Sequence, residues 1–228
     1  MLRRIFSHLF PVRCLVCGAC TEDHISGVCS RCASLVEPVP GPVCRVCGSP
    51  SASDVPCLRC QVDPPPYDRL ASAALFAGPL QDMIHAFKYT DATYFKGFLA
   101  RMLYDLVCAD ARHCDVITFV PLHWSRMVSR GYNQAAILAR ELSGMTGVPV
   151  GYGILKKLRS TAPQVGLTRQ GRERNIRGAF RAQGVAGRSV MVVDDVVTTG
   201  HTAREVCGAL KRAGADYVLF ASVGRIAP

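Results

Sequence analysis

Buried strands alternate with amphipathic helices along the greater part of the chain. Unbroken apolar or β-branched runs predict strands at 70–76, 116–120, 190–193 and 217–223. Apolar residues at helical spacing predict helices that begin near 78, 94, 133 and 203. This alternation predicts an α/β fold in which helices cover both faces of a mostly parallel sheet.

A polar turn joins the strand at 190–193 to the helix that follows it. Gly200 permits a tight turn, and threonine hydroxyls together with the N-terminus of the next helix suit a monophosphate. The adjacent acids suit ribose hydroxyls or hydrated Mg²⁺. The alternative is a receiver-type Mg²⁺ site beside a simple helix cap. The predicted ribose-phosphate site consists of Asp194, Asp195, Val196, Val197, Thr198, Thr199, Gly200, His201 and Thr202.

A second group of residues lies beyond the strand at 116–120. Residues 125–134 are expected to form a basic, glycine-containing turn, and ligands in open α/β sheets bind outside the carboxyl ends of strands. Forked arginine donors match diphosphate oxygens, whereas solvation of a helix end is the plainer interpretation. The candidate diphosphate-binding residues are Lys88, Pro121, Leu122, His123, Arg126 and Arg130.

Four Cys-x-x-Cys pairs occupy the first 60 residues, and two such pairs complete one tetrahedral zinc site. We predict two structural zinc sites, paired in sequence order, although an interleaved pairing uses the same ligands. The pairs are followed by a stiff proline run at 64–66. A zinc-ribbon domain over 1–63 and a second domain over 67–228 are therefore expected. The zinc ligands are Cys14, Cys17, Cys29, Cys32, Cys44, Cys47, Cys57 and Cys60.

The composition of the chain indicates its cellular compartment and the kind of partner that it binds. No apolar run approaches the ~20 residues that span a membrane, and residues 1–11 are expected to form a short amphipathic segment. The expected compartment is therefore the cytoplasm, where reducing conditions make metal binding a better explanation of the twelve cysteines than disulfides. The net charge is +10, and residues 156–188 hold nine basic side chains against the single acid Glu173. A polyanion such as diphosphate or nucleic acid is the expected partner there, and a solvated basic face is the alternative.

Several further motifs follow the cysteine pairs in a fixed order. They are 85–89 (HAFKY), 120–123 (VPLH) and 130–134 (RGYNQ). Residues 161–164 (TAPQ) then lead into 174–180 (RNIRGAF), and 193–202 (VDDVVTTGHT) resembles the phosphoribosyl diphosphate (PRPP) signature. Together these motifs resemble the ComF family of competence-associated proteins, and the resemblance covers nearly the whole chain.

This resemblance implies a double zinc ribbon joined to a type I phosphoribosyltransferase fold. Asp194 and Asp195 correspond to the ribose-binding acids, 198–202 to the 5′-phosphate loop, and 121–123 to the diphosphate loop. His201 stands where a small residue is usual, so its side chain is expected either to point outward or to add positive charge at the phosphate. Mg²⁺ is expected to accompany PRPP.

Two functions follow as hypotheses. The first is handling of incoming single-stranded DNA beside a helicase-type partner, with a PRPP site retained. The alternative is transfer of ribose 5-phosphate from PRPP to a nitrogen acceptor, although no stretch identifies that acceptor. The candidate nucleic-acid-binding residues are Lys156, Lys157, Arg159, Arg169, Arg172, Arg174 and Arg177.

Overall fold

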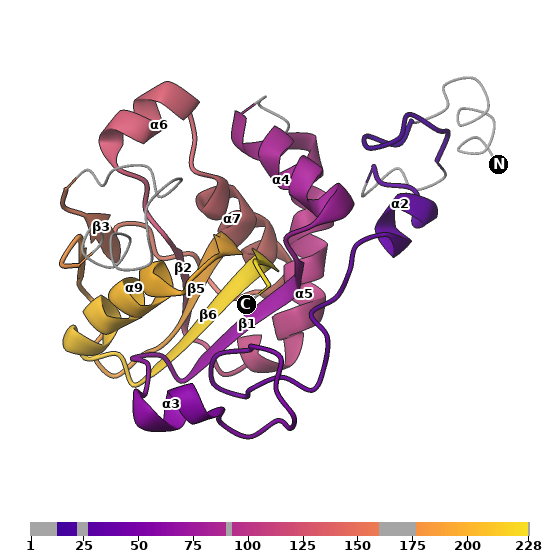
Figure 1. Ribbon diagram of the computed structural model, residues 1–228. Helices are drawn as coiled ribbons and strands as arrows, with labels where there is room; N and C mark the ends of the chain where they lie inside the picture. The colour runs from indigo at the N-terminus through magenta and orange to yellow at the C-terminus, as the bar shows by residue number, and fades with distance from the viewer. Residues whose placement is uncertain (1–12, 22–26, 90–92, 160–176, 228) are drawn as a thin grey trace.

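The computed structural model describes residues 13–21, 27–89, 93–159 and 177–227, and its centre is a four-stranded parallel sheet. The strand order is β1-β6-β5-β2 (Figure 1). The strands are β1 (Arg69–Leu75), β2 (Val116–Phe119), β5 (Ser189–Val197) and β6 (Tyr217–Arg225). The predicted strands are confirmed, and β5 continues through the two acids instead of stopping before them.

Helices cover both faces of this sheet, as expected from the alternating pattern. On one face, Val193 and Leu219 belong to a core with residues of α4, α5 and α7. On the other face, Val192 and Phe220 share a core with residues of α9. The elements are α4 (Gly78–Tyr89), the 3-10 turn η1 (Thr93–Phe95), α5 (Lys96–Ala111), α7 (Gln134–Thr146) and α9 (His201–Arg212).

Two elements differ from the sequence analysis. The segment expected as a turn contains the helix α6 (Trp124–Arg130), which ends where Gly131 adopts φ 75°. That prediction was wrong because the glycine terminates a helical turn and does not prevent one from forming. An antiparallel pair, β3 (Leu155–Lys157) with β4 (Phe180–Ala182), was not expected either, since three-residue strands leave little periodicity to detect.

The two cysteine-rich ribbons occupy different places. The first ribbon, which contains α2 (Ser30–Ser34), stands away from the sheet, whereas the second, which contains α3 (Leu58–Val62), lies against the body near β1 (Figure 1). The domain boundary at 64–66 remains a prediction, and the expected amphipathic segment at 1–11 lies outside the described residues. Among the helices described, none has the length and hydropathy needed to cross a membrane.

Candidate functional site

Asp194 and Asp195 lie near the carboxyl end of β5, in the interior of the sheet. Both are half-buried, and the backbone N–H of Asp195 donates to Oδ1 of Asp194 over 2.9 Å. Neighbouring strands β2 and β6 run parallel to β5, so their carboxyl ends open toward the same edge. The structure therefore presents the two acids where open α/β sheets receive ligands.

Lys88, from the last turn of α4, contacts this acid pair. Its Nζ lies 2.9 Å from Oδ1 of Asp195, and the two side chains are only 19% and 15% exposed. Limited exposure reduces solvent screening, so this contact is stronger than a surface ion pair. A candidate diphosphate residue thus joins the candidate ribose site in one cluster.

The pKa of Asp194 rises to about 8. Burial is the largest cause and the neighbouring Asp195 carboxylate is the second, while the charges of Lys88 and Lys157 and the Asp195 backbone N–H partly oppose them. Burial and the neighbouring carboxylate thus both favour the protonated form of Asp194, whereas Asp195 is paired with Lys88. A raised carboxyl pKa within a cluster of charges marks a functional-site candidate.

Asp194→Asn is expected to stabilise the fold at alkaline pH. Because the folded pKa of Asp194 lies above its unfolded value of about 3.9, folded wild type binds the extra proton and loses stability as pH rises toward 8. Asparagine does not ionise in this pH range, so the stability of the variant lacks this dependence on pH. The variant's advantage in unfolding free energy should grow by on the order of 2 kcal/mol between pH 6 and pH 8.5.

Urea unfolding of zinc-loaded protein at both pH values measures this difference. Asp105→Asn is the control, because Asp105 is exposed and pairs with Arg101 on the surface of α5. Parallel stability profiles for wild type and Asp194→Asn would contradict the raised pKa.

The loop after β5 places Gly200 before α9. Gly200 has φ 78°, a left-handed conformation that glycine tolerates best, and its carbonyl accepts from the Arg204 N–H over 2.9 Å. Thr198, Thr199 and Thr202 are half-buried beside it. His201 is only 8% exposed, so the expectation that its side chain points outward was wrong. The loop and the N-terminus of the twelve-residue helix α9 together suit an anion.

The other diphosphate candidates surround the end of β2. Pro121, Leu122 and His123 are half-buried there, and Arg130 ends α6 with Nη1 3.5 Å from Oε1 of Gln134. Arg126 lies in α6, but its side chain is outside the description. The structure thus brings Lys88 to the acid pair and leaves the others at the neighbouring strand end.

Sequence reasoning missed the residues that position Lys88. The hydroxyl of Tyr132 donates to the carbonyl of Phe87 over 2.6 Å, and Gln134 Nε2 lies 3.5 Å from the same oxygen. Asn133 Nδ2 donates to the carbonyl of Val120 over 3.0 Å. These contacts tie the end of α4 to the end of β2. The sequence motif at 130–134 contains these residues, and in the structure Asn133 and Gln134 are buried while Tyr132 is half-buried.

The basic candidates fall on and beside the β3–β4 pair. Lys156 is exposed opposite Arg181, Lys157 Nζ lies 5.5 Å from the centre of the Phe180 ring, and Arg159 donates to the carbonyl of Arg177 over 2.5 Å. Arg169, Arg172 and Arg174 lie outside the described residues. The described part of the segment is a basic ridge anchored through the Gly178 N–H, which donates to Glu205 of α9.

The eight paired cysteines gather into two groups of four, in sequence order. In each group the sulfur atoms lie within 4.8 Å of one another, and one S–S distance in each is 3.8 Å. A tetrahedron with Zn–S bonds of about 2.3 Å has edges of about 3.8 Å. Burial opposes ionisation of the Cys44 thiol, but backbone N–H groups of Cys47, Cys57 and Val46 lower its pKa to about 6. Both groups therefore fit structural zinc.

The second ribbon is docked on the sheet. The Leu70 N–H donates to the carbonyl of Val46 over 2.7 Å, and Arg225 at the end of β6 donates to Cys47 O and to Ser49 Oγ, each over 3.1 Å. The Ile226 N–H donates to the carbonyl of Val197 over 2.9 Å. A set of hydrogen bonds therefore connects the zinc ligands with β5, the strand that leads into the loop at 198–202.

Known proteins match both halves of this architecture. The family model of the double zinc ribbon domain matches residues 5–61, and that of the phosphoribosyl transferase domain matches residues 128–224. Among solved structures, the allosteric regulatory enzyme of purine biosynthesis is 28% identical with a TM-score of 0.37, over 54% of this chain and 24% of that one.

Two curated relatives match almost end to end. DNA utilization protein YhgH of Salmonella typhimurium is 37% identical over 215 residues, which are 91% of this chain and 94% of that protein. Competence protein F of Haemophilus influenzae is 31% identical over 222 residues, which are 92% of this chain and 96% of that protein. With these relatives matched over nine tenths of its length, and with a double zinc ribbon followed by a phosphoribosyltransferase domain, this chain belongs to the ComF family.

Proposed function

We propose that this chain handles incoming single-stranded DNA in the cytoplasm, beside a helicase-type partner, and that it retains a PRPP site. The cluster of Asp194, Asp195 and Lys88 beside a left-handed glycine loop is the observation that carries the retained site. The names of its relatives, a DNA utilization protein and a competence protein, support the DNA role.

Each part of PRPP has a matching group in this cluster. The loop at 198–202 offers backbone N–H groups and hydroxyls to the 5′-phosphate, and the acids offer acceptors to the ribose hydroxyls. Carboxylate oxygens also fit Mg²⁺, which would neutralise charge on the diphosphate. In the structure, Nζ of Lys88 lies 2.9 Å from Oδ1 of Asp195 and forms an ion pair with it. A bound diphosphate would compete for this lysine and free the Asp195 oxygens for ribose.

Phosphoribosyl transfer is the second candidate function. In that reaction the bond from C1 of PRPP to the diphosphate oxygen breaks, a bond from C1 to the acceptor nitrogen forms, and diphosphate leaves while the acceptor N–H proton passes to diphosphate or to solvent. Positioning and charge neutralisation are the main contributions that a protein makes to such a step. A cavity beside the phosphate loop, lined in part by Thr198, Thr199 and Gly200, favours this candidate because it offers space for an acceptor.

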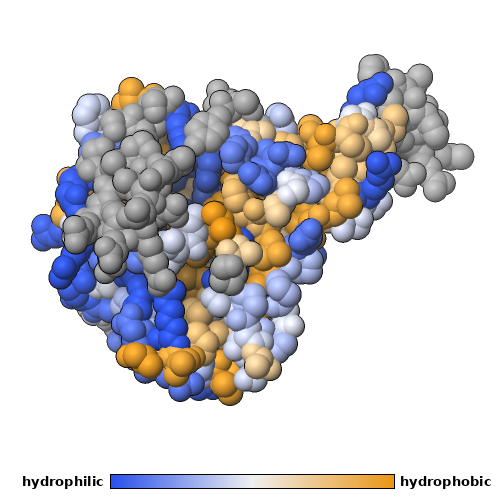
Figure 2. Space-filling model, viewed as in Figure 1, coloured by the Kyte–Doolittle hydropathy of each residue, from blue (hydrophilic) through white to orange (hydrophobic). Residues whose placement is uncertain are grey.

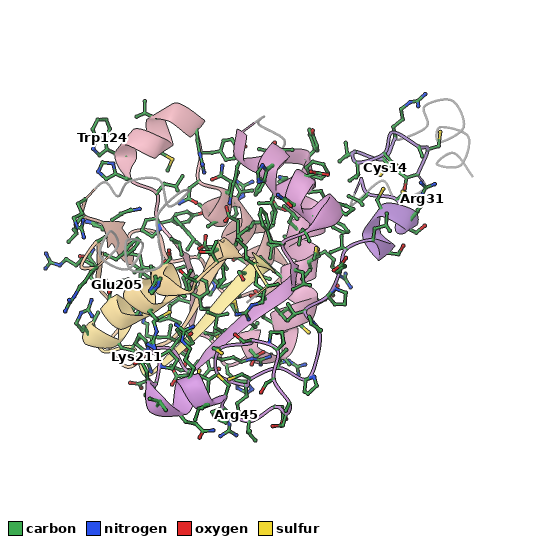
Figure 3. The ribbon with its side chains drawn as sticks, in the orientation of Figure 1. Cys14, Arg31, Arg45, Trp124, Glu205 and Lys211 are labelled. Atoms are coloured by element: carbon green, nitrogen blue, oxygen red, sulfur yellow. The ribbon has the colours of Figure 1, made fainter. Side chains whose placement is uncertain are left out.

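The basic ridge and α6 are the proposed DNA surface. Lys156 and Arg181 face solvent on β3 and β4 and suit phosphate oxygens. Trp124, at the start of α6, is 71% exposed and points away from the body (Figure 3). An exposed tryptophan near a basic ridge suits stacking of unpaired bases.

The second ribbon is the proposed docking surface for the protein partner. Leu58 and Val62, one helical turn apart on α3, are 74% and 77% exposed. Figure 2 shows an apolar patch at the position of α3, beside hydrophilic surface. A small apolar patch with a polar rim is typical of a protein contact. The zinc site beneath would keep this helix rigid.

Binding of a short single-stranded oligonucleotide should quench the fluorescence of Trp124, the only tryptophan in the chain. Replacing Lys156 and Arg181 with alanine should remove about two phosphate contacts and make the slope of log K against log salt shallower by about 1.4. Fluorescence titrations at several salt concentrations measure both effects.

Arg112→Ala with Arg140→Ala is the matched control, because both arginines are exposed and lie on α7 or just after α5. This control should keep the wild-type slope. Equal slopes for the two double variants, or DNA binding with no change in Trp124 emission, would exclude the proposed surface.

A further inference from the structure

A cavity of about 360 Å³ lies between the second zinc ribbon and the phosphate loop. One wall is formed by Val197, Thr198, Thr199 and Gly200, and the facing wall includes the zinc ligands Cys47 and Cys60. Asp194 and Asp195 do not line it. The cavity is thus separate from the acid pair but shares the phosphate loop with it, and its volume is within the range of small-ligand sites.

Arg225 is a buried, incompletely paired donor in this cavity. Only 7% of the residue is exposed, and its two terminal nitrogens donate to Cys47 O and Ser49 Oγ. Its Nε is buried and has no hydrogen-bond partner among the described residues. Leaving a buried donor unmet costs free energy, but this nitrogen has almost no accessible surface, so a ligand acceptor would reach it only after a shift of the Arg225 side chain.

Two further arginines line the same cavity. Arg204 of α9 reaches the backbone carbonyl and the carboxylate of Asp63 through one terminal nitrogen, which leaves the remaining guanidinium donors of Arg204 for other acceptors. Arg59 of α3 forms no ion pair with any described residue. Asp63 is the only carboxylate among the lining residues. Donors therefore outnumber carboxylate acceptors in the cavity.

The zinc-loaded cysteine site would add negative charge to the cavity wall but would leave the excess of hydrogen-bond donors in place. A Zn²⁺ ion held by four thiolates carries a net charge of about −2, which the adjacent Arg225 partly offsets. Asp63 is already paired with Arg204. Hydrogen-bond donors, rather than net charge, therefore define what the cavity can hold, and forked guanidinium donors match carboxylate and phosphate oxygens.

Apolar side chains complete the cavity. Tyr67 and Leu70 are buried at 7% and 2% exposure, and Val197 at 4%. Pro65 and Ile226 also line it. A polar anion alone would leave these walls without contacts, whereas a molecule with an apolar or ring body would fill them.

We propose that this cavity binds a small organic anion, a carboxylate or phosphate group on an apolar body, through Arg225, Arg204 and Arg59. Such a ligand would lie against the loop that is proposed to hold the 5′-phosphate of PRPP. Its role as the phosphoribosyl acceptor rests on the proposed function, but the anion site itself does not.

The probe is 4-fluorobenzoate, followed by ¹⁹F NMR with zinc-loaded full-length protein. Binding should broaden its signal, whereas the neutral analogue 4-fluorobenzamide should stay sharp. Arg204→Gln removes a forked donor and should weaken binding of the probe about tenfold or more. Arg212→Gln is the matched control on the same helix, because Arg212 does not line the cavity, and it should bind like wild type.

Arg225→Lys keeps the charge but removes the Nε donor, and it should weaken binding at unchanged zinc content. Absence of broadening with wild type at millimolar probe, or equal binding by wild type and Arg204→Gln, would overturn the anion site. If Arg225→Lys loses zinc, the comparison of Arg204→Gln with Arg212→Gln still decides.

A second titration separates the acceptor role from the site. With PRPP and Mg²⁺ present, continued binding of 4-fluorobenzoate would support an acceptor beside the phosphoribosyl group, and mutual exclusion would overturn that role. Failure of PRPP to bind at all, with the probe still bound to wild type, would contradict the proposed function and leave the anion site in place.

Discussion

Replacing Asp194 and Asp195 together with asparagine is expected to abolish binding of PRPP with Mg²⁺ in isothermal titration calorimetry. In the proposed site the two acids would supply the oxygen acceptors for ribose hydroxyls and hydrated Mg²⁺ at this strand end. Asparagine retains the shape of each side chain but carries no negative charge, so it cannot replace the Asp195 carboxylate. It also leaves Lys88 without the carboxylate that it contacts at 2.9 Å.

The matched control is Asp82→Asn with Asp105→Asn, which makes the same two substitutions at exposed positions. Zinc content should stay at the wild-type value in both double variants, and each should still unfold cooperatively, although loss of the Asp195 carboxylate leaves Lys88 unpaired and lowers the Tm. PRPP affinity that survives in the Asp194 and Asp195 variant would refute the assignment of the site.

Gly48→Ala is expected to destabilise the protein far more than Gly18→Ala. Both glycines follow a cysteine pair and have φ near 60–75°, so each alanine incurs a similar conformational cost of about 1–2 kcal/mol. A Cβ at Gly48 would lie 2.6 Å from the carbonyl oxygen of Leu70, whereas a Cβ at Gly18 would meet nothing within 4 Å. The backbone clash at Gly48 should cost about 2 kcal/mol more.

Thermal unfolding measures this difference, which corresponds to about 4–8 °C in Tm. Zinc retention after challenge with a chelator should fall in parallel, because the altered knuckle holds Cys44 and Cys47. Equal Tm values for the two variants would show that docking of the second ribbon on β1 contributes little to stability.

The sequence alone was sufficient to predict those features whose residues lie close together along the chain. The four strands, the left-handed turn at Gly200 and the Cys-x-x-Cys pairs each depend on residues within about ten positions of one another. The sequence-order pairing of the zinc ligands was also correct. In these cases the chemistry and the fold are encoded by neighbours along the chain.

Contacts between distant segments could not be derived in the same way. Lys88 was a candidate for diphosphate, but its contact with Asp195 depends on how α4 packs beside β5. Arg225 was not singled out, although it joins the second ribbon to β6. A lone arginine at the end of an apolar strand has no periodic signal, and its burial is decided by the ribbon that covers it.

The pairing of β1 with β6 affects how the protein folds during its synthesis. Arg69 is paired with Leu219, and the hydroxyls of Ser72 and Ser222 lie 2.7 Å apart across the two strands. The sheet therefore cannot close until nearly the whole chain has left the ribosome. All eight zinc ligands emerge before residue 61. At about 5–20 residues per second, a metal-loaded second ribbon would wait roughly 10–30 s for Arg225.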